Sequence, residues 1–86
     1  MGKDSYKSAV ITVTTEGTII TPVFDVNYVE IYAVDGEINF RLKSDNGWGD
    51  WVNLDSGNSY NLRFECSAVE IKSVTGSVEV KYVLTV

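Results

Sequence analysis

The feature that most constrains this chain is an alternation of apolar and polar residues with a period of two, which recurs from Ala9 to Leu84. Successive side chains of a β-strand point to opposite faces, so this period predicts strands with one buried face and one wet face. No segment shows a sustained helical period, and the strand-favouring residues Val, Ile, Thr, Tyr and Phe dominate. The sequence therefore predicts an all-β protein.

Two segments have the form of β-hairpins, with turns at Asp35-Gly36 and Thr75-Gly76. Folding at Gly36 in a type I′ turn pairs apolar residues with apolar residues and sets Glu30 opposite Arg41. Folding at Gly76 pairs the apolar residues equally well, and it sets Glu70 opposite Lys81 and Lys72 opposite Glu79. The segments align at an offset of 40 with five matches in fourteen positions. The two segments arose either by duplication or independently, as similar sequences that suit the same hairpin.

The two hairpins and further strands near 9–14, 18–24, 50–54 and 58–65 give about eight strands. Strands with one apolar face each predict an antiparallel two-sheet sandwich of jelly-roll or immunoglobulin-like type, with a small closed barrel as the alternative. We expect residues 1–7 to form an N-terminal arm and residues 8–86 to form a single β-sandwich domain.

Charge disfavours nucleic acid as a partner. The formal net charge is −5, and nucleic-acid binding depends on clustered basic side chains that replace counterions on phosphates. The seven basic residues are scattered singly, at Lys3, Lys7, Arg41, Lys43, Arg63, Lys72 and Lys81. No apolar run is long enough to cross a membrane, and the N-terminus lacks the apolar core of a signal peptide.

The chain is poor in catalytic groups. It has no histidine, the usual general base and the commonest metal ligand, and its single cysteine, Cys66, falls on an inward parity where a buried structural thiol is expected. Asp45, Asp50 and Asp55 recur at spacing five, but this is not the spacing of a calcium loop, and such residues also stabilise turns. We therefore expect no enzymatic activity, no cofactor and no metal site.

Both tryptophans lie in the expected loop Asp45–Trp51, at Trp48 and Trp51. Three interpretations stand: plugs over the end of the sandwich, a protein interface, or a platform that stacks on sugars. Strand parity places Trp51 on the side opposite Val52, facing outward. Tyr28 and Tyr32 share an outward face with Glu30. The expected interface or ligand-binding residues are therefore Trp48, Trp51, Tyr28 and Tyr32.

The whole chain resembles the small β-sandwich structural proteins of tailed-phage virions, such as head-decoration, auxiliary and fibre-associated proteins. The resemblance rests on the turn-to-strand segment LDSGNSYNL (54–62) and on the closing segment VEIKSVTGSVEV (69–80), after which the chain ends within its last strand. It implies a non-enzymatic protein, made in the host cytoplasm and incorporated into the virion. Such a protein binds capsid or tail subunits, commonly as a homo-oligomer. The alternative function is a carbohydrate-binding module that uses Trp48 and Trp51.

Overall fold

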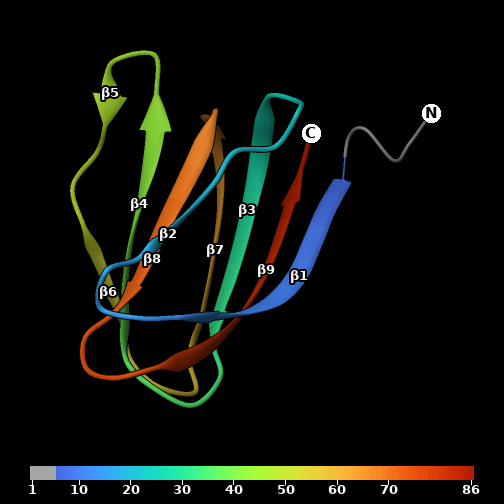
Figure 1. Cartoon of the computed structure of the whole chain (residues 1–86). Helices are drawn as coiled ribbons and strands as arrows, with labels where there is room; N and C mark the ends of the chain where they lie inside the picture. Colours follow the sequence, from blue (N-terminus) through green and yellow to red (C-terminus); the bar gives the residue numbers. More distant parts are fainter. Residues whose placement is uncertain (1–5) are drawn as a thin grey trace.

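The strands of this protein form two antiparallel sheets packed face to face (Figure 1). The structure is a computed structural model and describes residues 6–86. Its strands are β1 (Tyr6–Val13), β2 (Thr18–Ile20), β3 (Val26–Ala33), β4 (Ile38–Ser44), β5 (Gly47–Trp48), β6 (Val52–Leu54), β7 (Ser59–Cys66), β8 (Ala68–Ser73) and β9 (Val78–Thr85). No helix, and hence no helix able to span a membrane, occurs in the described residues.

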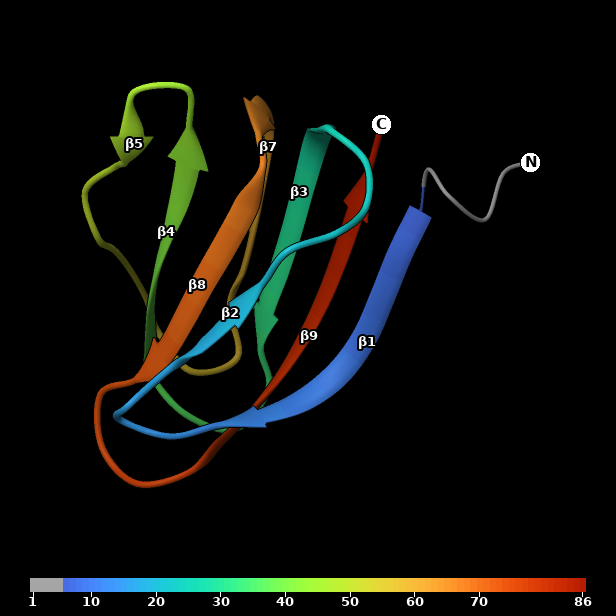
Figure 2. The same cartoon turned by 45° about the horizontal axis from the view of Figure 1, so that its top comes forward.

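The strand order is that of a jelly roll. Sheet A has the order β1-β9-β3-β7, and sheet B has the order β2-β8-β4-β5, with the short β6 also paired to β4. Strands β1 to β4 alternate between the two sheets, as do β7 to β9. The connections that cross from one sheet to the other can be traced in Figures 1 and 2. The predicted all-β, antiparallel two-sheet sandwich is thereby confirmed.

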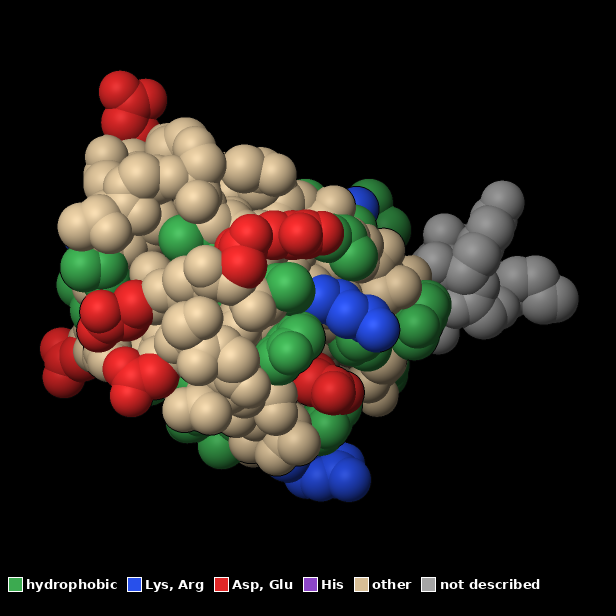
Figure 3. Space-filling view, turned by 90° about the horizontal axis from the view of Figure 1, so that it is seen from below, with side chains coloured by type: hydrophobic (Ala, Val, Ile, Leu, Met, Phe, Trp, Pro, Cys, Tyr) green, Lys and Arg blue, Asp and Glu red, His purple; other side chains and the backbone are tan. Residues whose placement is uncertain are grey.

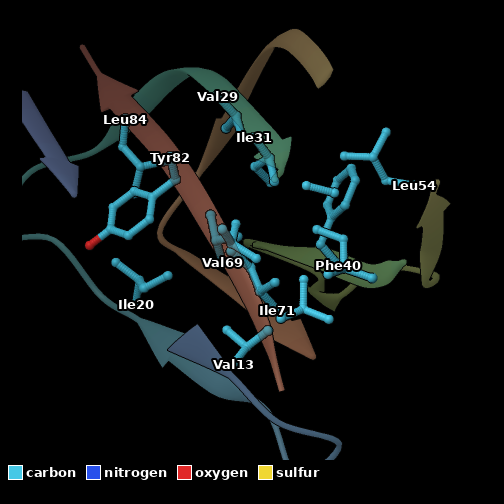
Figure 4. Close-up of a cluster of buried hydrophobic side chains, with 14 of the residues drawn as sticks. Val13, Ile20, Val29, Ile31, Phe40, Leu54, Val69, Ile71, Tyr82 and Leu84 are labelled. Carbon is cyan, nitrogen blue, oxygen red and sulfur yellow. The ribbon is translucent and has the colours of Figure 1, made fainter. Parts of the chain in front are cut away.

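The core lies between the sheets and is built from the inward parity of the strands (Figure 4). In sheet A, Ile31 sits between Tyr82 of β9 and Tyr60 of β7. In sheet B, Phe40 is flanked by Ile71 of β8 and by a residue of β6. The ring of Phe40 also reaches across the sandwich to Tyr60, with 5.0 Å between ring centroids. Apolar side chains from both sheets thus interdigitate in one core.

Both predicted hairpins are wrong. Strand β3 belongs to sheet A and β4 to sheet B, so the segment around Asp35 is an arch that carries the chain across the core. The segment around Thr75 is a second arch, from β8 to β9. Backbone bonds join one arch to the other: Val34 N–H donates to the Glu79 carbonyl, and Val74 N–H donates to the Glu37 carbonyl, each at 3.0 Å. The arches support one another instead of closing on themselves.

Gly36 illustrates why the turn prediction failed. A type I′ turn needs a positive φ at both central residues, but φ of Gly36 is not positive. A Cβ built at this position would instead overlap with Val78 Cγ2, at the start of β9. Glycine is therefore needed here for the close approach of the arch to β9. Period-two patterning does not separate an arch from a hairpin, because both bury the same alternate residues.

Smaller differences lie at the strand ends. Tyr6 and Lys7, expected in the N-terminal arm, belong to β1, and residues 1–5 of that arm lie outside the described residues. The alternating apolar series Tyr60, Leu62 and Phe64 predicts an inward side chain at Phe64, but Phe64 is 40% exposed. The register between β3 and β7 shifts between Val26 and Tyr28, opposite the end of β7, so strict alternation fails there.

Candidate functional site

The two tryptophans meet on the outer face of sheet B. The chain turns after β4 at Gly47, whose φ of 97° suits glycine, and this turn sets Trp48 opposite Lys43. The Gly49 N–H then donates to the Leu42 carbonyl at 2.9 Å, which keeps the segment against β4 before it enters β6. Trp51 follows on the outward parity that the sequence predicts, and it is 36% exposed.

The guanidinium of Arg41 lies between the two indoles. Its Cζ is 4.8 Å from the ring centroid of Trp48 and 4.5 Å from that of Trp51. Lys72 Nζ lies 4.2 Å from the Trp51 centroid, and Lys43 Nζ lies 5.9 Å from the Trp48 centroid. Each ring therefore has two cationic groups within the range of cation–π attraction. Neither ring belongs to the hydrophobic core cluster.

We call these five residues, Arg41, Lys43, Trp48, Trp51 and Lys72, the basic-aromatic face. Arg41 is also held by Glu70 of the neighbouring strand β8: Nη2 lies 2.8 Å from Oε1, and Nε donates to the same oxygen at 2.8 Å. Within residues 6–86 this is the one ion pair closer than 4.0 Å, so Lys43 and Lys72 have no carboxylate at that distance.

Sequence reasoning missed this cluster of charge. The three cations come from positions 41, 43 and 72, which look scattered along the chain. The register of β4 against β8 sets Arg41 opposite Glu70 and Asn39 opposite Lys72, which brings all three cations to one face. The only available signal was their shared outward parity, and using it required the correct pairing of β4 with β8.

Tyr28 and Tyr32, the other two predicted site residues, are not part of this surface. Both lie on β3 with outward parity in sheet A, on the opposite side of the sandwich. Tyr32 is 37% exposed and Tyr28 is partly buried. The four aromatic residues therefore form two separate pairs, one on each outer face.

The described residues contain little else that resembles an active site. No group of three or more Cys, Asp or Glu side chains among them is arranged to hold a metal ion. Cys66 is buried, and burial raises the pKa of its thiol to about 11, although a hydrogen bond from the backbone of Ala68 opposes the shift. A shallow polar hollow lies at the end of the sandwich beside Asp45 and Glu65. It has no bond or buried polar group that indicates a ligand.

No protein family and no curated protein sequence matches the chain. Solved structures match over most of it. A crystal structure of an HTH_3 family transcriptional regulator from Vibrio cholerae matches with a TM-score of 0.67 and 15% identity, covering 98% of this chain and 44% of that one.

Hydroxypropylphosphonic acid epoxidase from S. wedmorenis, in complex with fosfomycin, matches with a TM-score of 0.65 and 15% identity, over 95% of this chain and 44% of the enzyme. A crystal structure of FeII HppE matches with a TM-score of 0.65 and 16% sequence identity, covering 93% of this chain and 43% of that chain. This chain thus spans less than half the length of these proteins. At such low identity, the likeness shows that the sandwich fold is shared and shows nothing further.

Proposed function

We propose that the protein is a non-enzymatic structural protein of a tailed-phage virion, a capsid decoration or auxiliary subunit. In this proposal it binds neighbouring virion proteins through the outer face of sheet B. The observation that carries the proposal is the partly exposed stack of Trp48, Arg41 and Trp51, with ring-to-guanidinium distances of 4.8 and 4.5 Å.

The composition of this surface suits protein binding. Trp and Arg are the residues most enriched at the energetic centres of protein interfaces, because each offers a large contact area together with a polar group. Here the β4–β8 pairing and the Glu70 carboxylate fix Arg41 in place. A side chain that is already ordered loses less conformational entropy when a partner binds. The basic-aromatic face is therefore organised before binding.

The absence of an enzymatic role is part of the same proposal. The chain has no histidine, and the raised pKa of Cys66 keeps its thiol protonated near neutral pH, where it is a poor nucleophile. The jelly roll is also a fold used by viral capsid proteins and lectins. The second exposed pair, Tyr28 and Tyr32 on sheet A, offers a further contact surface for a neighbour on the other side.

Mass spectrometry of particles purified from the virus that encodes the chain tests the proposal. We expect the wild-type chain in the particles, and we expect the double variant Trp48→Ala/Trp51→Ala to be depleted while still folding. Phe64→Ala is the matched control, because it removes an exposed aromatic ring away from the basic-aromatic face and should leave incorporation unchanged. Absence of the wild-type chain from purified particles contradicts the proposal.

A second candidate is a carbohydrate-binding module, favoured by the two indoles that share one exposed face. Indole rings can stack on the apolar faces of sugars. The cations that already lie against both rings weigh against a free stacking platform. Titration of tryptophan fluorescence with glycans separates the two: a saturable change that is lost in Trp51→Ala favours the carbohydrate module.

A further inference from the structure

One end of the sandwich carries four exposed carboxylates. They stand on the first arch, on the loop between β6 and β7, and at the start of β9, and we call them the acidic end: Asp35, Glu37, Asp55 and Glu79. The segments 33–37, 55–58 and 74–79 that build this end contain no Lys or Arg. Figure 3, which looks onto the molecule from below, shows acidic side chains over this view, most of them on the side away from the N-terminus.

Three hydrogen bonds, of which one is between backbone groups, join the segments of the acidic end. Gly57 N–H donates to the Ala33 carbonyl at 2.7 Å and ties the β6–β7 loop to the first arch. The Glu79 N–H donates to Asp35 Oδ1 at 2.8 Å and ties the first arch to β9. The Glu37 carboxylate accepts a bond from Asn53 Nδ2 at 2.8 Å. Hydrogen bonds therefore hold the carboxylates of Asp35 and Glu37 and join the three segments of the acidic end.

The acidic end and the basic-aromatic face are complementary in charge, and in the described part of the chain no ion pair joins them. Arg41 is paired instead with Glu70 of its own sheet. Within residues 6–86, one molecule thus presents two cations, Lys43 and Lys72, on one surface and four carboxylates without a cationic partner on another.

We propose that the basic-aromatic face binds the acidic end of a second copy of this chain. The inference rests on the proposed function, because it names the partner of the same surface. Lys43 and Lys72 meet carboxylates of the neighbouring molecule, and the exposed Trp51 packs beside them and shields these pairs from water. A desolvated pair is much less weakened by salt than an exposed one.

The overall charge of −5 does not prevent this contact. At physiological ionic strength the Debye length is about 8 Å, so repulsion between the remote acids of two copies is largely screened. Charges in direct contact are screened much less. Local complementarity therefore decides the outcome at this salt concentration.

The contact joins two different surfaces and is therefore heterologous. Each copy has one face to offer and one end to offer, so association continues from copy to copy until a ring closes or a chain forms. Such head-to-tail contact differs from a two-fold dimer, in which one surface meets itself. This difference makes a charge-swap experiment decisive.

Sedimentation velocity of the full chain, from about 10 µM to about 1 mM, measures self-association. We expect concentration-dependent association of the wild-type chain at physiological ionic strength, where charges in direct contact are screened much less than remote ones. Lys43→Glu/Lys72→Glu makes the face acidic, and Glu37→Lys/Asp55→Lys/Glu79→Lys leaves Asp35 as the one remaining carboxylate of the acidic end and makes that end basic. Each variant alone should be monomeric, because its face and end then carry like charges.

An equimolar mixture of the two variants should associate again, since the native face of one meets the native end of the other. Lys81→Glu/Arg63→Glu, on the outer face of sheet A, is the matched control for charge and should associate like the wild type. Circular dichroism and melting temperatures establish that every variant is folded.

Two results overturn the inference: a wild-type chain that stays monomeric up to about 1 mM, or an associating wild type with a variant mixture that stays monomeric. Either result leaves the proposed function intact if the chain is still found in particles. A chain absent from particles that nevertheless shows the swap pattern contradicts the proposed function alone.

Discussion

The guanidinium of Arg41 binds the carboxylate of Glu70 across strands β4 and β8, at 2.8 Å, and not that of Glu30, its predicted partner. Glu30 lies on the outer face of sheet A, on the far side of the sandwich. The identity of the carboxylate that pairs with Arg41 therefore shows that β4 lies beside β8. Arg41 also lies against both indoles of the candidate site, so the sheet pairing and the site depend on one side chain.

Arg41→Ala should lower the free energy of unfolding by about 1–3 kcal/mol, because it removes a partly buried charged hydrogen bond and the cation between two rings. A double-mutant cycle with Glu70→Gln should give a coupling energy of about 1 kcal/mol. The matched cycle with Glu30→Gln should give a value within about 0.3–0.5 kcal/mol of zero. Urea denaturation measures both. Equal coupling in the two cycles would contradict the β4–β8 register.

The sequence was sufficient to predict the sandwich because alternate burial is a property of each strand alone. The alternating pattern places Ile31, Phe40, Ile71 and Val80 on the apolar side of their strands, and all four are buried. Strand pairing is different, because it depends on where the chain crosses from sheet to sheet. An arch and a hairpin bury the same residues, so the pattern around Gly36 fits either.

The candidate site depends on pairing and was therefore predicted only in part. Outward parity was enough to indicate that Trp51 is exposed and that Tyr28 and Tyr32 share one face. It did not indicate that these tyrosines lie on the other sheet from Trp51. Nor did it indicate that Lys72 reaches Trp51, since that contact needs β8 beside β4.

Gly36→Ala should destabilise the protein by about 1–3 kcal/mol, because its methyl group would overlap with Val78 and overpack the arch. Adding Val78→Ala makes room for that methyl group. The cost of Gly36→Ala measured in the Val78→Ala background should therefore be smaller than in the wild type. Thermal and chemical denaturation of the four proteins of this cycle give the values.

Gly57→Ala is the control for this cycle. Its φ of 83° strains any residue with a Cβ, but no atom lies within 4 Å of that position. It should cost about 1–2 kcal/mol from backbone strain alone, with or without Val78→Ala. If the costs of Gly36→Ala and Val78→Ala simply add, the close approach of the arch to β9 is not the reason for glycine at position 36.

Phe40→Ala should cost about 3–5 kcal/mol, a large part of the 5–15 kcal/mol that typically stabilises a small domain. Phe40 is 1% exposed and packs against Tyr60 from the opposite sheet, so its loss leaves a cavity between the sheets. Phe64→Ala, at a ring that is 40% exposed, should cost less than about 1 kcal/mol. Unfolding in urea compares the two directly. Similar costs for both would contradict the placement of Phe64 outside the core.

Cys66 should make the protein less stable in alkaline solution. Burial raises the pKa of the folded thiol from 9.0 to about 11, whereas the thiol of the unfolded chain is expected to ionise near the lower value. Between these two pH values the unfolded state binds fewer protons than the folded state, so stability falls as pH rises. One pKa unit corresponds to about 1.4 kcal/mol, so a shift of two units gives a loss of the order of 3 kcal/mol. Burial also raises the pKa of Tyr82, which adds a loss of the same sign at higher pH.

Cys66→Val isolates the contribution of the thiol, because valine keeps the site apolar and has no proton to lose. Urea midpoints measured across this pH range should fall less steeply in Cys66→Val than in the wild type, with the remaining slope due to groups such as Tyr82. The native thiol should also resist alkylation at neutral pH and react once the chain is unfolded. A thiolate that appears near pH 9 in the ultraviolet spectrum of the folded protein would contradict the buried position of Cys66, and equal alkaline slopes for the two proteins would rule out its part in the pH dependence.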